Sequence, residues 1–361
     1  MKYLFKALII SILFLSCEPD NTPDELAGIP HAPKPFVFKT DDKQFGKPDI
    51  PADNPMTLEG IELGRRLFYD SILSRDSTIS CASCHHINGA FTDNRAISAG
   101  IEGRVGTRSS MAIVNLAFHK SSFFWDGRTA SLEKQALMPV EDHLEMDENW
   151  EKAIQKIQKH KDYPTFFRQA FPITKKVEIT KELAVKAIAQ FERSIVSHNS
   201  RYDKFLKGQI EFTDAEQFGH DMFFNKVSNI PDAQCGHCHG EPLTTGNNLV
   251  NNGLQDAPTY DDFKDKGYGG VVNVKNENGK MKIVTLRNIA ESAPYMHNGS
   301  LNTLEEVVEH YNTGGKYSPN KDPLIQQIQL NSVQKKQLIA FLKTLSDSTF
   351  LNNKAYMSPF K

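Results

Sequence analysis

The apolar positions of this chain recur mainly at the spacing of helices, and we interpret them as core positions. One stripe repeats every four residues, which predicts the buried face of an amphipathic helix. Its members are Leu183, Ala187, Phe191 and Ile195. A second stripe predicts a final helix over residues 332–345. Its members are Leu338, Phe341, Leu342 and Leu345.

Helix starts and turns favour the same class of fold. Two segments carry the Thr-x-x-Glu pattern of a capping box, namely Thr213 with Glu216 and Thr303 with Glu306. One segment departs from helical spacing, because Asn278 and Gly279 separate short alternating runs and so predict a β-hairpin. We therefore expect a mainly α protein whose sheet is limited to a short hairpin in the C-terminal part.

The two halves of the chain resemble each other. One repeat relates residues 61–70, IELGRRLFYD, to residues 216–225, EQFGHDMFFN, and a second relates residues 114–135 to residues 287–308. The matched positions are Gly64 with Gly219, Phe68 with Phe223, Asn115 with Asn288, Gly127 with Gly299, and Leu132-Glu133 with Leu304-Glu305. This repeat predicts two related domains, residues 50–205 and 206–350, followed by a tail of residues 351–361.

Composition narrows the class of protein. Apolar residues make up 39% of the chain and the net charge is -2, and the mean hydropathy is -0.46. These values are typical of an ordinary globular chain. The absence of a basic run or of interleaved basic and aromatic residues argues against a nucleic-acid partner.

The N-terminus carries an export signal. Residues 1–17, MKYLFKALIISILFLSC, combine Lys2 and Lys6 with an apolar run too short to cross a bilayer. Ser16 before Cys17 forms a loose lipobox, which predicts cleavage and lipidation of Cys17; an ordinary signal peptide with an incidental cysteine is the alternative. Residues 18–49 are rich in Pro and acidic residues and predict a flexible tether. We expect a periplasmic protein, lipid-anchored to a membrane of a Gram-negative-type cell.

Four of the five cysteines fall in two copies of one motif. The copies are Cys81-Ala-Ser-Cys84-His85 and Cys235-Gly-His-Cys238-His239. C-x-x-C-H is the attachment pattern of c-type haem, in which two thiols bind the macrocycle and the histidine binds the iron. The alternatives are a four-thiolate zinc site and a thioredoxin-like redox pair. Two haems would make each half a cytochrome c-like domain.

The repeat also shows where the halves differ. Eight residues beyond Thr303 lies Tyr311, whereas eight residues beyond Ser131 lies Pro139. Tyrosine can bind iron and proline cannot. We therefore expect a closed C-terminal iron that carries electrons and an open N-terminal iron that does chemistry.

The chain resembles the bacterial di-haem cytochrome c peroxidase / MauG superfamily over essentially its whole mature length. The landmarks are, in order, ISCASCH, FFWDGR, CGHCH, TLRNIAESAPYMHNGS and TLEEVVEHY. The resemblance implies that the N-terminal haem reduces peroxide and that the C-terminal haem accepts electrons from a small redox protein. It also implies Trp125 between the haems, and Glu145 and Gln135 on the open face of the peroxidatic haem, as proton shuttle and peroxide-binding amide.

Two departures from the family pattern change the expected mechanism. Many relatives carry a distal histidine where this chain has Ile101, so we expect an N-terminal haem that needs no reductive activation. His119 and His143 are the histidines that could substitute. The common peroxidases have methionine where this chain has Tyr311, and tyrosine is characteristic of MauG. A calcium site is also implied by the resemblance, at Ser109 and the carbonyls of Ser292 and Pro294.

Three functions follow as hypotheses. The leading one is a peroxidase that reduces hydrogen peroxide with electrons from a small c-type cytochrome or cupredoxin. The second is a MauG-like oxidase that uses peroxide to modify a partner protein or a small molecule. The third is a di-haem electron carrier without catalysis. The membrane is expected as a partner through the lipid anchor alone, and a homodimer is one option for assembly.

Overall fold

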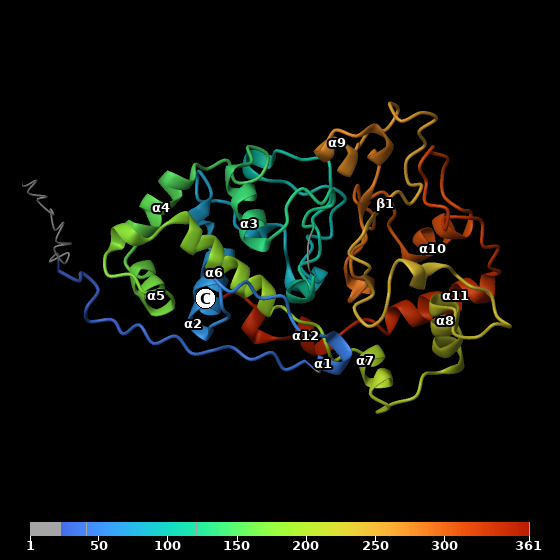
Figure 1. The fold of residues 1–361 in the computed structure, drawn as a ribbon, viewed down its shortest axis with the longest axis horizontal. Coiled ribbons are helices and arrows are strands. Elements are labelled where there is room, and N and C mark those ends of the chain that lie inside the picture. The colour runs from blue at the N-terminus through green and yellow to red at the C-terminus, as the bar shows by residue number, and fades with distance from the viewer. Residues whose placement is uncertain (1–22, 41, 120–121, 361) are drawn as a thin grey trace, which may run out of the picture.

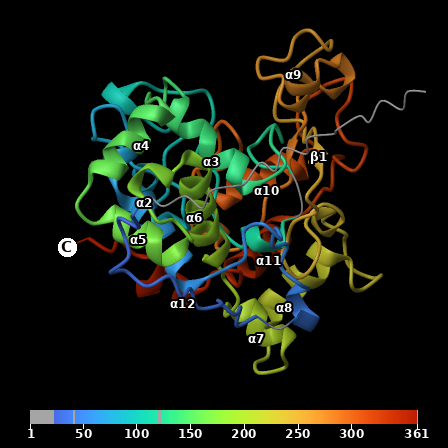
Figure 2. The same cartoon turned by 60° about the vertical axis from the view of Figure 1, so that its left-hand side comes forward.

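The chain forms two helical lobes that lie side by side (Figure 1), and in a second view α2 to α6 again lie mainly on the left, with the C-terminal lobe partly overlapping them (Figure 2). The computed structural model describes residues 23–40, 42–119 and 122–360. Helices α2 to α6 make the N-terminal lobe, and α7 to α11 with a two-stranded sheet make the C-terminal lobe. The expected mainly helical fold with little sheet is confirmed.

The elements of each lobe are as follows. The N-terminal lobe contains α2 (Leu58–Tyr69), α3 (Leu132–Glu141), α4 (Trp150–Lys159), α5 (Tyr163–Ala170) and α6 (Lys181–Ser194). The C-terminal lobe contains α7 (Arg201–Leu206), α8 (Asp214–Phe224), α9 (Tyr268–Val272), α10 (Leu304–Asn312), α11 (Ser332–Lys343) and the strands β1 (Leu249–Val250) and β2 (Met281–Lys282). Two short helices, α1 (Asp42–Phe45) and α12 (Ser348–Leu351), lie outside these sets.

A matched pair of glycines allows the main helix crossing of each lobe. In the N-terminal lobe, a Cβ at Gly64 of α2 would overlap the carbonyl oxygen of Ala187 on α6. In the C-terminal lobe, a Cβ at Gly219 of α8 would overlap the carbonyl oxygen of Gln337 on α11. Both crossings therefore depend on the missing side chain, since any larger residue would push the helices apart.

In each lobe, one of two matched buried asparagines joins a 3-10 turn to the end of the last long helix of that lobe. Asn115 and Asn288 have φ angles of 59° and 58°, and each precedes a turn of 3-10 helix. The Asn115 N–H donates to the Ile195 carbonyl at 3.0 Å, and the Asn288 N–H donates to the Leu345 carbonyl at 3.0 Å. The repeat seen in the sequence is thus a repeat of backbone geometry.

The hairpin expected at Asn278 and Gly279 is wrong. The residues before this turn form α9 and a 3-10 turn, and β2 pairs antiparallel with β1, with Lys282 opposite Leu249. Val271, Val272 and Val274 are exposed, so their alternation has no apolar face to bury. Asn278 instead uses its side-chain amide to donate to the Tyr260 carbonyl at 2.9 Å.

The described part of the segment that we expected to be a flexible tether is packed against both lobes. Leu26 is 4% exposed in the N-terminal core, and Asp24 pairs with Arg168 at 3.1 Å. Phe45 packs its ring 5.5 Å from that of Phe118, and the Arg287 guanidinium of the C-terminal lobe lies 5.1 Å from the centre of the same ring. The prediction of a mobile tether overlooked these apolar anchors, because they are spaced too irregularly to form a stripe.

The two ends of the C-terminal domain also differ from the sequence boundaries. Tyr202 of α7, counted with the first domain, is buried in the core of the C-terminal lobe. Phe350 of α12 is 2% exposed among N-terminal phenylalanines, 6.0 Å from the Phe91 ring. The hydroxyl of Tyr69 donates to the Tyr356 carbonyl at 2.6 Å, so the tail returns to the first lobe.

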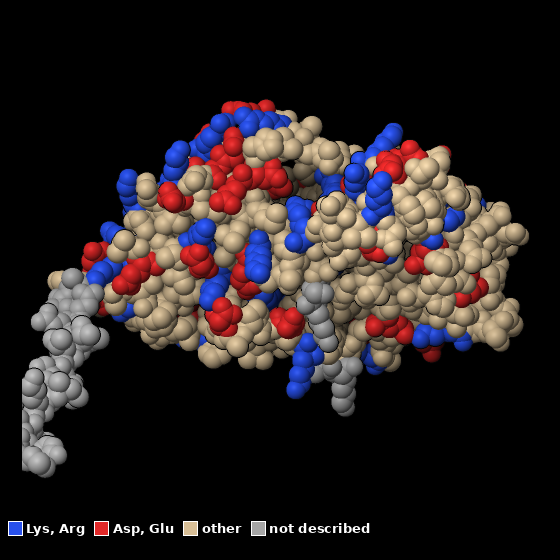
Figure 3. Space-filling model, turned by 45° about the horizontal axis from the view of Figure 1, so that its top comes forward, with Lys and Arg blue, Asp and Glu red and all other residues tan. Residues whose placement is uncertain are grey.

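The surface carries mixed charge. On the face drawn in Figure 3, basic and acidic side chains are interspersed, and the surface is hollowed near its middle. None of the helices in the described ranges is long and apolar enough to cross a bilayer. The export signal and Cys17 lie outside the described residues, and both stay predictions.

Candidate functional site

Each lobe encloses one cavity beside its C-x-x-C-H motif. The N-terminal cavity has a volume of about 240 Å³ and is lined by Cys81, Cys84 and His85. The C-terminal cavity has a volume of about 210 Å³ and is lined by Cys235, Cys238 and His239. The remaining walls of both cavities are mainly apolar side chains, as expected for a macrocycle site.

Both motif histidines are oriented for metal binding. The Nδ1 of His85 bonds to the Phe91 carbonyl oxygen at 2.7 Å, and the Nδ1 of His239 bonds to the Thr244 carbonyl oxygen at 2.9 Å. A carbonyl accepts only a proton, so Nδ1 carries the hydrogen and Nε2 keeps its lone pair. This arrangement is the usual support for an imidazole that binds iron. Burial lowers the pKa of both rings, which keeps them neutral.

The thiols do not fit the two alternatives to haem. The cysteine pairs line different cavities, so they do not form one four-thiolate zinc site. Redox-active thiols need a lowered pKa, whereas burial raises the pKa of Cys84 to about 11 and that of Cys235 to about 12. None of the four forms a disulfide bond, so all four are available for attachment to a macrocycle.

The N-terminal cavity brings together the predicted peroxide-handling residues. The cavity is lined by Gln135 and Pro139 of α3, by His85, and by Glu145. Glu145 is more exposed than the other three residues. Protein atoms around the cavity limit hydration of the Glu145 carboxyl, and this desolvation raises its pKa to about 7. The charge of Asp142 raises that pKa further. Glu145 can therefore exchange a proton near neutral pH.

Glu145 is held by its backbone against the loop that carries Ile101. The Ile101 N–H donates to the Glu145 carbonyl at 2.8 Å, and a Cβ at Gly100 would overlap the Leu144 carbonyl. Ile101 is fully buried and lines neither cavity. His143, one of the two histidines considered as substitutes, has a side chain 75% exposed and does not line the cavity either.

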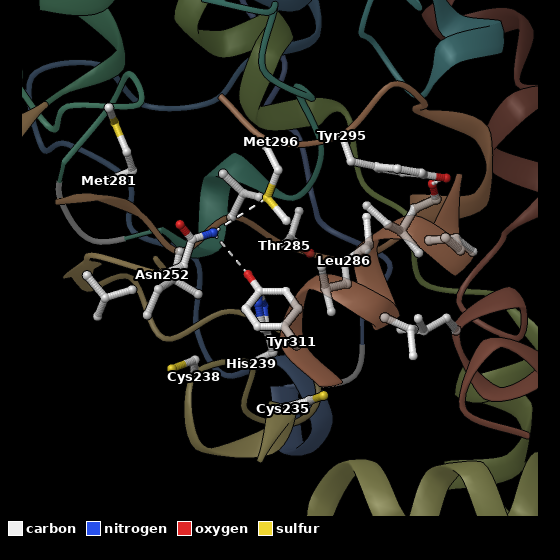
Figure 4. Close-up of a pocket in the computed structure, with 18 of the residues that line it drawn as sticks. Cys235, Cys238, His239, Asn252, Met281, Thr285, Leu286, Tyr295, Met296 and Tyr311 are labelled. Carbon is white, nitrogen blue, oxygen red and sulfur yellow. Dashed lines mark hydrogen bonds between the residues drawn. The ribbon is translucent and has the colours of Figure 1, made fainter. Parts of the chain in front are cut away.

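The C-terminal cavity contains Tyr311 opposite an amide. The side-chain amide of Asn252 donates to the Tyr311 hydroxyl oxygen at 3.1 Å and to the Met296 sulfur at 3.5 Å (Figure 4). Burial raises the pKa of Tyr311 to about 12, while the Asn252 hydrogen bond acts in the opposite direction. A metal cation would favour the phenolate further.

Trp125 stands in the wall between the cavities and lines both. Its indole Nε1–H donates to the Ser109 carbonyl at 2.9 Å. Its repeat equivalent is His297, and the two rings contact each other edge to face, with centroids 6.4 Å apart. Trp125, which we predicted to lie between the two haem sites, therefore lies between the two cavities.

The residues suggested for calcium also lie in this region. Ser109, Ser292 and Pro294 all line the C-terminal cavity, and the Ser109 hydroxyl donates to the Met296 carbonyl at 2.9 Å. Within the described residues, no group of three or more His, Cys, Asp and Glu side chains could hold a metal ion. Calcium there would have carbonyl, hydroxyl and water oxygens as ligands, and it stays a prediction.

Comparison with known proteins identifies the family. A model of the di-haem cytochrome c peroxidase family matches residues 58–211. The cytochrome-c peroxidase IdrP1 of Denitromonas iodatirespirans is 32% identical over 325 residues, which cover 82% of this chain and 84% of that protein. The chain belongs to the di-haem cytochrome c peroxidase family. Membership implies haem cofactors and an oxidoreductase of the peroxidase and MauG group.

Relatives within the family include both kinds of enzyme. The methylamine utilization protein MauG of Methylophilus methylotrophus is 29% identical, with 88% of this chain and 92% of that protein covered. Among solved structures, a MauG-like protein associated with microbial copper homeostasis is 34% identical, with a TM-score of 0.82 over 90% of this chain and all of that one. The MauG-like relative therefore shares this architecture.

Sequence patterns missed several polar residues of the cavities. Asn252 and Lys282 line cavity walls, and Glu192, 4% exposed, lines the N-terminal cavity with one carboxylate oxygen lacking a partner among the described residues. Burial raises the pKa of Glu192 to about 8. The sequence signal that could have found these residues is a polar residue inside an apolar run, such as Lys282 between Met281 and Ile283.

Proposed function

We propose that this di-haem protein reduces hydrogen peroxide to water in the N-terminal cavity, with electrons that enter through the C-terminal cavity from a small c-type cytochrome or cupredoxin. The observation that carries the proposal is the convergence of Gln135, Glu145 and His85 on one cavity, with Trp125 in the wall toward the other. His85 and His239 would bind the two irons, and the four motif thiols would attach the macrocycles. A haem bound at His85 would supply the electrons for cleavage of the peroxide O–O bond.

The chain's own residues handle the protons. Ionised Glu145 accepts a proton from one oxygen of hydrogen peroxide and returns it to the other, so that water can leave; such proton transfer contributes about 10²–10⁴-fold to a rate. The Gln135 amide holds the peroxide by hydrogen bonds. Two electrons and two protons convert one hydrogen peroxide into two waters, and Trp125 lies on the path of the electrons.

Steady-state kinetics test this proposal. The fully oxidised holoenzyme, mixed with peroxide and a reduced small cytochrome c, should turn over without prior reduction, because Ile101 offers no ligand to displace. Absence of turnover in both the oxidised and the half-reduced enzyme would remove the proposal. Turnover only after half-reduction would remove the claim that activation is unnecessary.

A second candidate is MauG-like oxidation of a partner protein or small molecule. It is supported by Tyr311 with its Asn252 hydrogen bond and by the likeness to the MauG-like structure at 34% identity. Poor turnover with electron donors, together with oxidation of an added protein substrate by peroxide, would favour it. Low-spin signals from both irons would instead support the third hypothesis, a carrier without catalysis.

Tyr311→Phe tests the closed state of the C-terminal iron. We expect the ferric EPR spectrum to lose one low-spin signal and gain a high-spin one, because phenylalanine cannot bind iron. Loss of an anionic ligand should favour reduction by about tenfold, which is about 59 mV for one electron. Tyr317→Phe, at a position 64% exposed and outside both cavities, is the control. An unchanged spectrum would show that Tyr311 is not a ligand.

The cell location and the ligands beyond haem belong to the same proposal. We place the enzyme in the periplasm, lipid-anchored through Cys17, with calcium at Ser109 and the carbonyls of Ser292 and Pro294. Cys17→Ser should release the protein from the membrane fraction. Calcium removal by a chelator should alter the haem spectra if the cation supports the wall between the cavities.

A further inference from the structure

The wall between the two cavities holds a basic pair that the proposed reaction does not use. Lys282 of β2 lines both cavities, and His119, which follows the 3-10 turn Leu116–Phe118, lines the N-terminal one. Both are buried, with 5% and 4% exposure. Two buried basic side chains from different lobes thus line the same cavity, and Lys282 also borders the other one.

His119 has an unused hydrogen-bonding capacity. Neither ring nitrogen has a partner among the residues that the structure describes. Burial, and then the positive charge of Lys282, lower the pKa of His119 to about 3, so the ring is neutral and has one N–H to donate. A buried polar group without a partner is costly, which indicates that this wall normally faces a polar ligand.

Lys282 is also the charged neighbour that acts on His119, whereas Asp142 and Arg128 act on Glu145. His119 and Lys282 both line the N-terminal cavity, and the charge of Lys282 reaches the His119 ring.

Lys282 connects the basic pair to Trp125. Its ammonium donates to the Ser122 carbonyl and lies 5.3 Å from the centre of the Phe123 ring. Its backbone N–H donates to the Trp125 carbonyl at 2.7 Å. A contact that fixes the Lys282 side chain therefore also restrains the backbone that positions the Trp125 indole.

The two arginines that line this cavity are paired with carboxylates from the protein. Arg108 donates to Asp265 through two nitrogens at 2.8 Å and to Asp126 at 2.5 Å. Arg128 pairs with Asp126 at 3.1 Å. These two guanidinium groups already have anionic partners, so they are less suited to a further acid group.

We propose that Lys282 and His119 form a carboxylate-binding pocket that receives a propionate of the haem in the N-terminal cavity. This inference rests on the proposal that haem occupies that cavity. A haem propionate brings a carboxylate into a buried space, where it is stable only when paired and hydrogen-bonded. The ammonium and the imidazole N–H supply these two contacts. Lys282 is thus a positioning residue that relates the haem edge to Trp125.

The test compares holoprotein variants by haem properties rather than turnover. Lys282→Met removes the charge at similar length, and His119→Phe removes the N–H donor. Both should lower the midpoint potential of the N-terminal haem, because an uncompensated propionate stabilises the ferric state. For Lys282→Met we expect about a tenfold weaker reduction, about 59 mV for one electron. The propionate bending band of the resonance Raman spectrum should shift in both variants.

Three comparisons keep the test decisive. Lys280→Met removes a lysine on the same segment that pairs with Glu277 and lines neither cavity, and it should change nothing. His119→Asn keeps an N–H donor and should restore the Raman band. If Lys282→Met fails to incorporate haem, the His119→Phe and His119→Asn pair gives the answer.

Other outcomes would overturn the inference. Unchanged potential and Raman band in both variants would show that no propionate binds here. An acetate-dependent shift in the wild type that Lys282→Met abolishes would assign the pocket to a free carboxylate. A change from low-spin to high-spin iron in His119→Phe would make His119 an iron ligand. None of these readouts requires peroxide turnover, so failure of the peroxidase proposal remains distinguishable.

Discussion

The two cavities present the same helix face to their contents, yet on that face one cavity has a tyrosine where the other has a proline. Helices α3 and α10 contribute the same four positions to their cavities. The pairs are Leu132 with Leu304, Gln135 with Val307, Ala136 with Val308, and Pro139 with Tyr311. Two of the pairs are apolar in both lobes. In the other two, the C-terminal lobe has valine in place of the Gln135 amide and tyrosine in place of Pro139.

This comparison shows how a duplicated scaffold can separate two roles. The glycine crossings and asparagine bonds keep the paired helices of both lobes alike, and on the matched face of α3 and α10 the divergence lies in two side chains that reach the cavity. Glu145 adds a third difference, because a segment after α3 brings a carboxyl of raised pKa to the N-terminal cavity. Under the proposed function, these local substitutions would separate peroxide chemistry from electron transfer within one fold.

The largest expected effect breaks the asymmetry directly. Pro139→Tyr places a phenol at the position that Tyr311 occupies in the other lobe, so it should close the N-terminal iron. We expect peroxide turnover to fall to background and the high-spin ferric signal to disappear. Met138→Tyr, at a neighbouring position 39% exposed and outside the cavities, should keep both. Retained turnover in Pro139→Tyr would mean that the two positions are not equivalent.

The next effect removes the carboxyl that only the N-terminal cavity has. Glu145→Gln should lower kcat/KM for peroxide by about 10²–10⁴-fold, because the amide cannot accept the proton. Glu141→Gln, on the same segment but exposed and outside the cavity, should retain the wild-type rate. Equal rates for all three proteins would place proton transfer elsewhere.

The pH dependence of kcat/KM also tests the role of the Glu145 carboxyl. The Glu145 pKa of about 7 means that the carboxyl is protonated, and inactive as a base, below that pH. The wild-type kcat/KM should therefore fall about tenfold per pH unit below about 7 and level off above it. Glu145→Gln should lack this acidic limb. A wild-type limb centred near the ordinary pKa of a glutamate would contradict a desolvated carboxyl.

The smallest expected effect tests whether the glycine helix crossings of the two lobes are equivalent. Gly64→Ala and Gly219→Ala should each lower the free energy of unfolding by about 1–3 kcal/mol, because a methyl group forces the paired helices apart. Gly28→Ala, where a Cβ meets no atom within 4 Å, is the control for both in denaturant unfolding. A large loss in one lobe and none in the other would mean that the crossings are not equivalent.

Local patterns predicted the parts of the fold that depend on local physics. The capping box at Thr213 is formed as expected, and Thr303 caps its helix although Glu306 turns to the Asn302 N–H. The stripes of α6 and α11 are buried, with Phe191 and Phe341 at 0% exposure. Helix periodicity, capping and repeats need only neighbours along the chain.

The parts that failed depend on contacts distant in sequence. The strand at Lys282 pairs with Leu249 rather than with its own neighbours, which no alternation pattern could reveal. The basic pair of His119 and Lys282 joins residues from two lobes, so the sequence shows only one isolated histidine and one isolated lysine. The cavity around Glu145 likewise brings together segments that no spacing rule connects.

The return of the chain end to the first lobe has a consequence for biosynthesis. Phe350 completes an aromatic cluster begun by Phe68, and Tyr356 accepts a hydrogen bond from Tyr69. The packing of the half that is made first is therefore finished only after Phe350 and Tyr356 have been made. A premature stop codon before Phe350 would accordingly damage the N-terminal lobe, although residues 50–205 would all have been translated.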